Sequence, residues 1–535
     1  MSRMTHLTVP ITVHDRPAAL ADAARATEMG ADLIEYRVDT FCPPDVDVEE
    51  IQKLVAESPL PCIVTCRPTW EGGDYDGDEM HRISLIEHAG LGEQGITPAY
   101  LDVELKAYQT SANLRQKVGL VVDHEDQPRP DVTTGLILSS HDFVTQPADL
   151  DRKLMAMAEA PTCRVIKLAW RGRSLRDNLE AFEILRRKLK PTIALCMGDE
   201  GLPSRVLAKK FGALLTFAAL DPAQGTAPGQ PTVSDLKNLY RWDAIREDTA
   251  VYGVIGYPVG HSMSPAFHNA GFDETNYNGV YLPMPIPPEY EHFKATVLSW
   301  LDYEPLHFRG ASVTIPHKAN LLRFVEEQGG EIEPLAATIG AANTLSKRDD
   351  GTLYASNTDY AALLDATCEA LSITREELSG KTLGILGAGG AARAAVAAFT
   401  HYGSRVTVYN RTVDKAEALA DQFDATAKPM DQLGETAYDI LINCTPLGMF
   451  PQTDATPLPS EKQGILGPGV VVFDTIYNPL ETVLLRDAKA AGCLTINGAE
   501  MFVRQGAAQF ELWTQQTPPL DVFRRVLLEK LASAE

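Results

Sequence analysis

A lysine and a histidine near the ends of two strand-like runs are the residues best suited to chemistry in the first half of the chain. Lys167 lies in RVIKLAW, on the same strand face as Val165 and Ala169, with no other charge before Arg171. Burial at such a position favours a neutral amine, which is the form that attacks a ketone to make a Schiff base. His141, near the end of LILSSHD, is the base that we expect to move protons. Either residue alone has an ordinary structural explanation, but the two together at strand ends predict an imine-forming site.

Lys318 and Asp359 form the candidate pair in the second half of the chain. They combine a cation that can donate a proton with a carboxylate that can orient it, and hydride transfer to a ketone needs such a donor at the new alkoxide. The alternative is a surface salt bridge, which spacing alone does not exclude. The surrounding runs HSMSPAFHN, GASVTIPHKANL, GAANTL and SNTDY are rich in hydroxyls and amides, which suit a polyhydroxylated acid.

Residues 382–412 have the layout of a dinucleotide-binding unit, with an apolar strand, a glycine turn, an Ala-rich helix and a second strand. Gly387, Gly389 and Ala392 match the G-x-G-x-x-G/A fingerprint: the first Gly permits the tight turn, the second lets the backbone approach a pyrophosphate, and the small third residue allows close packing. The helix then points its positive end at the phosphates. An ordinary glycine turn is the alternative, but the flanking strand and helix favour the cofactor site. The same turn contains Ala388, Gly390 and Ala391.

The end of the second strand of this unit indicates which dinucleotide is bound. A cofactor with a free ribose 2′-hydroxyl is usually met by Asp or Glu at this point, whereas this chain has Asn410, Arg411 and Thr412. An arginine there suits a 2′-phosphate, so we expect NADP. If Arg411 is only a solvated surface cation, the choice of nicotinamide cofactor stays open.

Strand-like runs alternate with helical stretches over roughly the first 220 residues, which predicts a (β/α)8 barrel. The runs are LTVPITV, LIEYRVD, CIVTCRP, YLDVEL, KVGLVVD, LILSSHD, RVIKLAW, TIALCMG and LLTFAAL. Charges recur on one face of several runs, as in Leu33, Glu35, Arg37 and Asp39, in Ile63, Thr65 and Arg67, and in Tyr100, Asp102 and Glu104. Because branched apolar residues usually fill such a barrel, charges near the strand ends indicate a substrate pocket. Buried ion pairs such as Glu35 with Arg37 are the alternative.

Length and composition indicate a globular protein of two to four domains. The chain has 535 residues, 44% of them hydrophobic and 22% charged. Its formal charge of -24 argues against a nucleic-acid partner. The eight cysteines stand singly, with no C-x-x-C and no zinc spacing, so we expect reduced thiols, no metal and a cytoplasmic location. The start of the chain enters a strand-like run, without a signal-peptide pattern or a membrane-crossing stretch. The pattern indicates no particular oligomeric state.

The first half of the chain resembles type I 3-dehydroquinate dehydratase over about residues 5–240, with EYRVD, CRPTWEGG, SSHDF, IKLAW, SRVL and TAPGQ in order. By that resemblance, Lys167 forms an imine with the substrate ketone, and His141 removes the adjacent proton and later helps the hydroxyl leave. The resemblance makes Glu71 the residue that orients His141. It also implies contacts to substrate hydroxyls from Glu35, Arg37 and Arg67, to the carboxylate from Arg205, and from a closing loop with Thr226 and Gln230.

From about residue 250 onward the chain resembles shikimate dehydrogenase, whose motifs again occur in order. Lys318 and Asp359 match its catalytic pair. The resemblance implies substrate contacts from Ser262, Ser264, Thr314, Asn343, Tyr477 and Gln505, and places Asn443, Thr445, Gly448, Met449, Gly498 and Met501 on the nicotinamide side. Three departures, Met263, Ser312 and Tyr360, resemble the plant-type fused enzyme and leave selectivity between shikimate and quinate open.

The two resemblances together imply an α/β protein that carries out consecutive steps of the shikimate pathway on small-molecule substrates, 3-dehydroquinate, 3-dehydroshikimate and shikimate. We expect a barrel at 1–240, a substrate-binding domain at 250–360, a Rossmann-type NADP domain at 375–490, and a C-terminal segment at 491–535 that returns to the substrate-binding domain. One alternative is a regulator that binds the same acids without turnover, which the intact lysines, His141 and Asp359 disfavour. The other is a NAD-dependent quinate dehydrogenase, which the Asn-Arg-Thr strand end disfavours.

Overall fold

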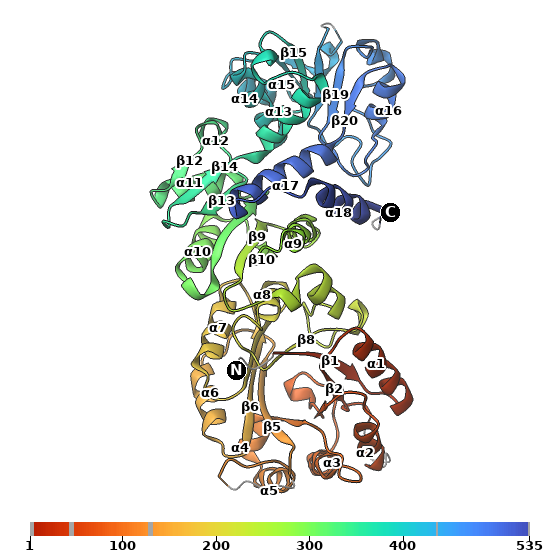
Figure 1. Ribbon diagram of the computed structural model, residues 1–535, viewed down its shortest axis with the longest axis vertical. Coiled ribbons are helices and arrows are strands. Elements are labelled where there is room, and N and C mark those ends of the chain that lie inside the picture. Colours follow the sequence, from red (N-terminus) through yellow and green to blue (C-terminus); the bar gives the residue numbers. More distant parts are fainter. Residues whose placement is uncertain (1–4, 42–47, 127–131, 435–436, 533–535) are drawn as a thin grey trace. The chain divides into compact units, whose positions relative to one another are not determined.

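The computed structural model describes residues 5–41, 48–126, 132–434 and 437–532. The chain divides into two compact units (Figure 1). The first consists of Met1–Ala250, Asn278–Ile286 and Ala295–His307, and the second consists of Val251–Tyr277, Pro287–Lys294 and Phe308–Glu535. Cys42 lies outside the described residues, and the other seven cysteines are unbridged.

The first unit contains an eight-stranded parallel barrel, as the sequence predicts. The strand order is β7-β6-β5-β4-β3-β2-β1-β8, and the two end strands meet where Leu214 N donates to Thr192 O at 2.9 Å. The strands are β1 (His6–Thr12), β2 (Leu33–Arg37), β3 (Cys62–Thr65), β4 (Tyr100–Glu104), β5 (Gly135–Asp142), β6 (Cys163–Arg171), β7 (Thr192–Met197) and β8 (Leu215–Phe217). The helices are α1 (Arg16–Glu28), α2 (Glu49–Ala56), α3 (Glu79–Leu91), α4 (Leu105–Thr110), α5 (Ala112–Val121), α6 (Leu150–Glu159), α7 (Asp177–Arg187) and α8 (Leu202–Val206).

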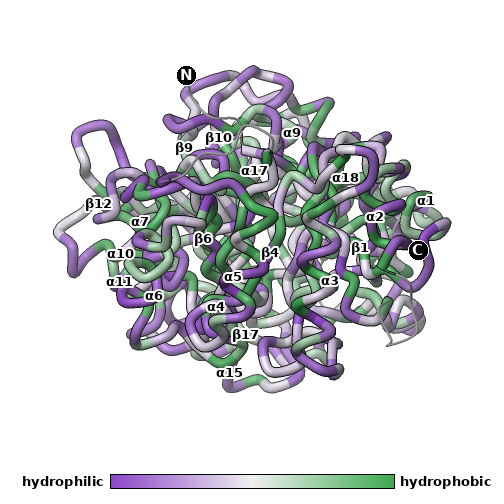
Figure 2. The backbone as a smooth tube through the Cα atoms, turned by 90° about the horizontal axis from the view of Figure 1, so that it is seen from below, coloured by the Kyte–Doolittle hydropathy of each residue, from purple (hydrophilic) through white to green (hydrophobic). Residues whose placement is uncertain are grey.

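The barrel interior changes from apolar to polar along the strands. Residues early in the strands, including Leu33, Ile63 and Ile137, form a closed apolar cluster. Two residues further along the same faces come polar side chains such as Glu35, Thr65 and Ser139, all buried. Strand periodicity of two therefore explains why an apolar floor supports a polar layer at the carboxyl ends. Figure 2 shows hydrophobic stretches along β4 and β6 and hydrophilic loops at the periphery.

One of the nine predicted strand runs is wrong. The run KVGLVVD overlaps helix α5, which ends at Val121. Leu114, Val118 and Val121 are buried, and their spacing of four and three residues is the repeat of a helix with one apolar face. A short apolar run with β-branched residues is compatible with a strand and with a buried helix, so the sequence pattern did not distinguish the two.

The second half of the chain contains two six-stranded sheets. The first has the order β10-β9-β11-β13-β14-β12. Its strands are β9 (Ala250–Gly256), β10 (Gly279–Pro285), β11 (Phe308–Val313), β12 (Glu331–Ile332), β13 (Thr344–Lys347) and β14 (Leu353–Ser356), and its helices are α9 (Ser264–Glu274), α10 (Tyr290–Asp302), α11 (Lys318–Glu327) and α12 (Pro334–Ile339).

The other sheet is parallel and has the order β17-β16-β15-β18-β19-β20, the doubly wound order of a Rossmann fold. Its elements are α13 (Thr358–Leu371), β15 (Thr382–Leu386), α14 (Gly390–His401), β16 (Arg405–Asn410), α15 (Val413–Ala420), β17 (Thr426–Pro429), β18 (Ile440–Asn443), β19 (Val471–Asp474), α16 (Val483–Ala490) and β20 (Leu494–Ile496). Strand order reverses between β15 and β18, and such a switch point is where ligands bind in open α/β sheets.

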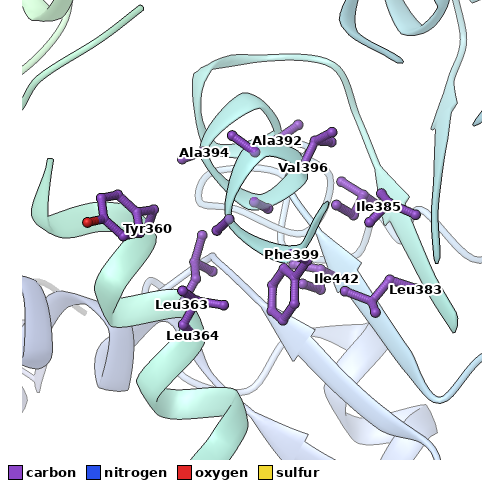
Figure 3. Packing of buried hydrophobic residues seen from close by; sticks show 14 of the residues in the cluster. Tyr360, Leu363, Leu364, Leu383, Ile385, Ala392, Ala394, Val396, Phe399 and Ile442 are labelled. Atoms are coloured by element: carbon purple, nitrogen blue, oxygen red, sulfur yellow. The ribbon is translucent and has the colours of Figure 1, made fainter. Parts of the chain in front are cut away.

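The core of the Rossmann sheet is built from small and branched residues. Figure 3 shows Leu363 and Leu364 of α13 on the side of α14 where Phe399 lies, and Val396 of α14 on the side of Ile385 of β15. The alanines of α14 let this helix lie close to the sheet, as the predicted fingerprint requires.

The last two helices pack against elements that precede the Rossmann sheet in sequence. These helices are α17 (Gly498–Thr514) and α18 (Leu520–Ala532). Trp513 Nε1 of α17 donates to Leu345 O of β13 at 3.0 Å, and Phe523 of α18 stacks on Phe267 of α9 with ring centroids 3.9 Å apart.

Candidate active sites

A pocket at the carboxyl ends of the barrel strands gathers every site residue predicted in the first half of the chain. Its lining includes Lys167, His141, Glu71, Glu35, Arg37, Arg67, Arg205, Thr226 and Gln230. These residues come from strands and loops spread over almost 200 positions of sequence, and the parallel strand order brings their ends to one mouth. The lining also includes Phe143, Met197 and Phe217, which the sequence analysis did not single out.

Lys167 is buried as predicted but is not isolated from charge. Its side chain is 6% exposed, and its Nζ lies 2.8 Å from Asp102 Oδ2 and 3.2 Å from Glu35 Oε1. Its own strand has no other charge before Arg171, but the carboxylates of Glu35 on β2 and Asp102 on β4 reach the amine across the lumen. The ring of Phe217 covers the amine at 4.6 Å from the ring centroid.

The charged residues of the lumen form a continuous buried network. Arg67 Nη2 lies 2.8 Å from Asp102 Oδ1, and its Nη1 lies 2.7 Å from Glu104 Oε1. Arg82 Nη1 contacts the second oxygen of Glu104 at 2.7 Å. Burial alone raises the pKa of the Asp102 carboxyl, but the Arg67 and Lys167 cations outweigh burial and hold that pKa well below its ordinary value. Asp102 is therefore an anion at any working pH.

The alternative pairing of Glu35 with Arg37 is not the one that the structure has. Arg37 Nη2 lies 2.5 Å from Asp39 Oδ2, while Glu35 accepts from Lys167 and, at 2.9 Å, from Thr65 Oγ1. Arg37 and Asp39 lie on the same face two residues apart, so Arg37 pairs with Asp39 and not with Glu35.

His141 and Glu71 form the second contact pair of this pocket. The backbone N of His141 donates to Glu71 Oε1 at 2.8 Å, and Nδ1 lies 3.3 Å from the same oxygen. Burial lowers the pKa of His141 well below its ordinary value, and the Arg67 and Lys167 cations act in the same direction. Burial raises the pKa of Glu71 to about 7. The imidazole is therefore neutral at pH 7, with its Nδ1 side turned to a carboxyl.

Arg205 differs from the other arginines of the pocket because its charge is unmatched. It is 1% exposed, and its Nε and Nη2 have no hydrogen-bond partner among the residues that the structure describes. Burial lowers the pKa of this guanidinium to about 10, so it is charged at neutral pH. Gln230 Nε2 is likewise buried and unpartnered, while its Oε1 accepts from Thr226 N at 3.1 Å. Unsatisfied buried donors in one pocket indicate a site for an acceptor-rich anion.

In the second unit, Lys318 and Asp359 lie in direct contact. Lys318 Nζ donates to Asp359 Oδ2 at 2.6 Å, with side chains 33% and 16% exposed. Lys318 begins α11, and Asp359 lies in the first turn of α13, where Asn357 caps the helix and accepts from Asp359 N at 3.0 Å. The starts of two helices thus place the backbones of this pair.

The predicted hydroxyls and amides of the substrate side lie at one edge of the first six-stranded sheet. Ser262 follows β9 and Thr314 follows β11, and these strands are parallel neighbours. Ser264 N donates to Ser262 Oγ at 3.3 Å. Asn343 is 3% exposed, and its Oδ1 accepts from Thr358 N at 2.8 Å, so much of its amide is engaged within the protein.

The predicted residues Tyr477, after β19, and Gln505, on α17, both contact Phe502 of α17. The Tyr477 and Phe502 ring centroids are 5.5 Å apart, and Gln505 Nε2 donates to Phe502 O at 3.2 Å. Sequence analysis did not single out Gln509, one helical turn beyond Gln505 and 1% exposed. Its Oε1 accepts from Ser312 Oγ at 2.7 Å. The spacing of four residues on one helix was the available signal.

The glycine turn between β15 and α14 has the conformation that its fingerprint requires. Gly387 has φ of 107°, and its N donates to Tyr409 O at 2.7 Å. A Cβ placed on Gly389 or Gly390 would meet nothing within 4 Å, so open space lies in front of the N-terminus of α14. Backbone N–H groups facing open space at a helix start suit a pyrophosphate. Ala388 and Ala391 lie in the same turn and are partly exposed.

The remaining residues predicted for the cofactor lie at neighbouring strand ends. Arg411 and Thr412 are exposed beyond β16, and Asn410 Nδ2 donates to Thr412 O at 2.8 Å. Thr445 follows β18 and bonds to Asn443 Oδ1 at 2.7 Å. Gly448, Met449, Gly498 and Met501 follow β18 or begin α17, and Met501 packs on the Rossmann core.

Among the described residues, no group of three or more His, Cys, Asp or Glu is placed to hold a metal ion. A search of the same residues finds no helix with the length and apolar character needed to cross a membrane.

Fold and sites together define an α/β protein of two parts, a barrel with a buried lysine and histidine at its mouth and a two-lobed dinucleotide-binding dehydrogenase. Family models match accordingly: type I 3-dehydroquinase at residues 7–247, the shikimate dehydrogenase substrate binding domain at 254–345, shikimate / quinate 5-dehydrogenase at 369–448, and the shikimate 5′-dehydrogenase C-terminal domain at 498–528. The chain belongs to the bifunctional 3-dehydroquinate dehydratase/shikimate dehydrogenase family.

Two relatives support this assignment, one over nearly the whole chain and one over its second half. The chain is 35% identical to the chloroplastic bifunctional 3-dehydroquinate dehydratase/shikimate dehydrogenase of Arabidopsis thaliana, over 97% of this chain and 83% of the relative. Its second half is 40% identical to the shikimate dehydrogenase (NADP(+)) of Methanothermobacter thermautotrophicus, over 52% of this chain and 96% of the relative. A solved structure of dehydroquinate dehydratase and shikimate dehydrogenase from S. pombe is 25% identical, covers 99% of this chain and 98% of its own, and has a TM-score of 0.44.

Proposed function

We propose that the chain catalyses two consecutive reactions, the loss of water from 3-dehydroquinate in the barrel and the NADPH-dependent reduction of the resulting 3-dehydroshikimate to shikimate. The observation that carries the first reaction is one pocket with a buried lysine amine, a neutral histidine and an unpaired arginine. The family to which the chain belongs supports both reactions.

In the barrel, the Lys167 amine attacks the substrate ketone, a carbon–nitrogen bond forms and one water leaves, which gives a protonated imine. His141 takes the proton on the adjacent carbon, and the electron pair moves toward the imine nitrogen. The hydroxyl then leaves with a proton from His141, and water hydrolyses the imine and frees Lys167. The Nδ1 side of His141 faces Glu71, which leaves Nε2 for these transfers. Arg205 binds the carboxylate, and the other polar groups of the pocket hold the hydroxyls.

In the dehydrogenase half, NADPH supplies a hydride to the ketone carbon when it is bound. Lys318 supplies the proton to the ketone oxygen, and Asp359, 2.6 Å from its amine, holds that amine in place. The substrate is held by the hydroxyls and amides at the sheet edge, Ser262, Ser264, Thr314, Asn343, Tyr477 and Gln505. We assign the dehydration to residues 1–240, the substrate side of the reduction to 250–360 and 491–535, and dinucleotide binding to 375–490.

The cofactor assignment to NADP rests on the exposed Arg411 at the end of β16 and on the NADP(+)-dependent relatives of this half. Gly389 and Gly390 leave room for the phosphates, and Thr445, Gly448, Met449, Gly498 and Met501 would lie on the nicotinamide side. The test is Arg411→Ala beside Arg405→Ala, an exposed arginine at the opposite end of the same strand. We expect the NADPH over NADH preference to fall about 10- to 100-fold in the first variant only, the size of a charge-assisted hydrogen bond.

The decisive experiment follows NADPH absorbance after 3-dehydroquinate is added to the purified chain. Oxidation that stops in Lys167→Ala, and that 3-dehydroshikimate restores in that variant, supports both activities. If 3-dehydroshikimate causes no oxidation in the wild-type chain, the reductase assignment is wrong, and quinate with NAD is the next pair to assay.

Because the observed thiols are unbridged, we also place the protein in the cytoplasm, which cell fractionation tests.

A further inference from the structure

Asp102, on β4, is the charged residue closest to the Lys167 amine. It is fully buried, and its Oδ2 lies 2.8 Å from Lys167 Nζ, against 3.2 Å for Glu35 Oε1. Neither the barrel pocket lining nor the motifs of the sequence include Asp102. Its position two residues after Tyr100 puts it on the inner face of β4, opposite Lys167 on β6.

The second oxygen of Asp102 is fixed by two donors. Arg67 Nη2 lies 2.8 Å from Oδ1, and Ser139 Oγ donates to the same oxygen at 2.6 Å. Arg67 is itself held by Glu104, so the carboxylate sits in a rigid frame. Oδ2 is thereby aimed at the lysine nitrogen, and the donors on Oδ1 favour the ionised form.

Imine chemistry creates a charge at the atom that Asp102 faces. The condensation of amine and ketone with one proton yields water and an imine whose nitrogen is positive. A buried cation without a counter-charge is strongly unfavourable. The positive nitrogen also draws the electron pair released when His141 removes the adjacent proton, and a neutral imine would accept that pair less readily.

We propose that Asp102 is the counter-ion of the lysine nitrogen, pairing with the ammonium of the free protein and then with the protonated imine during proton removal and loss of the hydroxyl. This role rests on the proposed imine at Lys167. Glu35 also accepts a hydrogen bond from Thr65 and lines the substrate pocket, so it remains available to the substrate.

The test compares Asp102→Asn with Glu104→Gln, which removes a buried carboxylate of the same network that touches Arg67 but not Lys167. Borohydride with 3-dehydroquinate traps the imine as added mass at Lys167, and both this trapping and the turnover number are measured against pH. In Asp102→Asn, we expect turnover to fall about 100-fold. We also expect the pH of half-maximal trapping to shift, because the lysine nitrogen loses the anion that lies 2.8 Å away. In Glu104→Gln, that pH should stay at the wild-type value.

Each outcome separates the counter-ion role from a structural one and from failure of the proposed function. Equal loss of turnover in both variants with an unmoved trapping profile overturns the role. If the wild-type chain gives no adduct at Lys167, the proposed imine itself is wrong. In Asp102→Asn, Lys167 keeps Glu35 and Arg67 keeps Glu104, so we expect it to fold. If it does not, Ser139→Ala decides: about tenfold lower turnover with unchanged thermal unfolding supports the role, and unchanged turnover overturns it.

Discussion

Two buried arginines of the barrel pocket are paired in opposite ways. Arg67 lies within hydrogen-bond distance of Asp102 and Glu104, while Nε and Nη2 of Arg205 have no partner among the described residues. An unpaired buried charge destabilises a fold, and removing one member of a buried pair does so as well. Arg205 therefore weakens the unliganded barrel, which makes sense if a bound anion completes its contacts.

Replacement of the two arginines by methionine should change stability in opposite directions. We expect Arg205→Met to raise the free energy of unfolding of the unliganded protein by about 1–3 kcal/mol, because it removes unsatisfied donors. Arg67→Met should lower it by about 3–5 kcal/mol, because two carboxylates lose their partner. Urea unfolding checks both, and the dehydration KM of Arg205→Met should rise at least about tenfold. Destabilisation by Arg205→Met would show that the guanidinium has a structural role instead.

The pH dependence of the dehydration should follow Glu71. Its pKa is raised to about 7 by burial, whereas that of His141 lies well below the ordinary value. Below pH 7 the carboxyl of Glu71 is protonated and no longer attracts the Nδ1 proton of His141, so turnover should fall as pH drops through about 7. Glu71→Gln should remove this limb of the profile and lower turnover at pH 8 about 10- to 100-fold. A limb that persists in Glu71→Gln would assign the titration to another group.

Sequence patterns found the residues with recognisable motifs and missed those whose importance comes from strand register. Asp102 was visible as part of a charged strand face, but its contact with Lys167 joins β4 to β6, and no spacing within one strand reveals it. Gln509 was missed although it repeats Gln505 after one helical turn, because its partner Ser312 lies almost 200 residues away.

Among the elements, the turn between β15 and α14 contains one glycine that the backbone conformation requires and another that the cofactor site requires. Gly387 has a positive φ of 107° and a Cβ there would lie 3.1 Å from Cys444 O, so alanine is strained at this position. At Gly389 a Cβ would meet no protein atom within 4 Å. The first glycine thus serves the backbone, and the second keeps a surface clear.

Replacing these two glycines by alanine should therefore change different properties, stability in one case and cofactor binding in the other. Gly387→Ala should lower the free energy of unfolding by about 1–3 kcal/mol, the range for backbone strain. Gly389→Ala should leave thermal unfolding unchanged and raise the KM for NADPH, because the methyl group stands where the pyrophosphate approaches. Kinetics with saturating 3-dehydroshikimate and varied NADPH check the second variant. An unchanged KM there would place the dinucleotide elsewhere.

Strand prediction succeeded where alternation along the run was strong and failed where it was absent. Along β2 and β4, the charged residues lie on one face and alternate with apolar residues on the other face. This alternation is expected for a barrel strand whose inner face is partly polar. Residues 118–122 carry no polar side chain and show no alternation, and the packing of α5 beside α3 decided the conformation of this region. Tertiary packing overrides local preference in runs of this kind.

On the scale of the whole molecule, each half has its own buried core and its own set of site residues. The barrel cluster contains Leu33, Ile137 and Val165, and the Rossmann cluster contains Ile385, Val396 and Phe473, with no residue in common. A lysine substituted in one site leaves the core of the other half intact. We therefore expect each reaction to survive loss of the other.

This independence predicts that two inactive chains restore the coupled reaction when mixed. With 3-dehydroquinate and NADPH, Lys167→Ala should give no oxidation because no ketone product forms, and Lys318→Ala should give little because the proton donor is missing. An equimolar mixture should oxidise NADPH after a lag, since 3-dehydroshikimate made by the second variant reaches the first through solution.

The lag should shorten as both concentrations rise, because the intermediate then accumulates faster. The wild-type chain at the same concentration of active sites gives the reference lag. Wild-type chains without a lag beside a slow mixture would indicate transfer within one chain. No recovery in the mixture, although each variant performs its remaining reaction alone, would contradict exchange of the intermediate through solution.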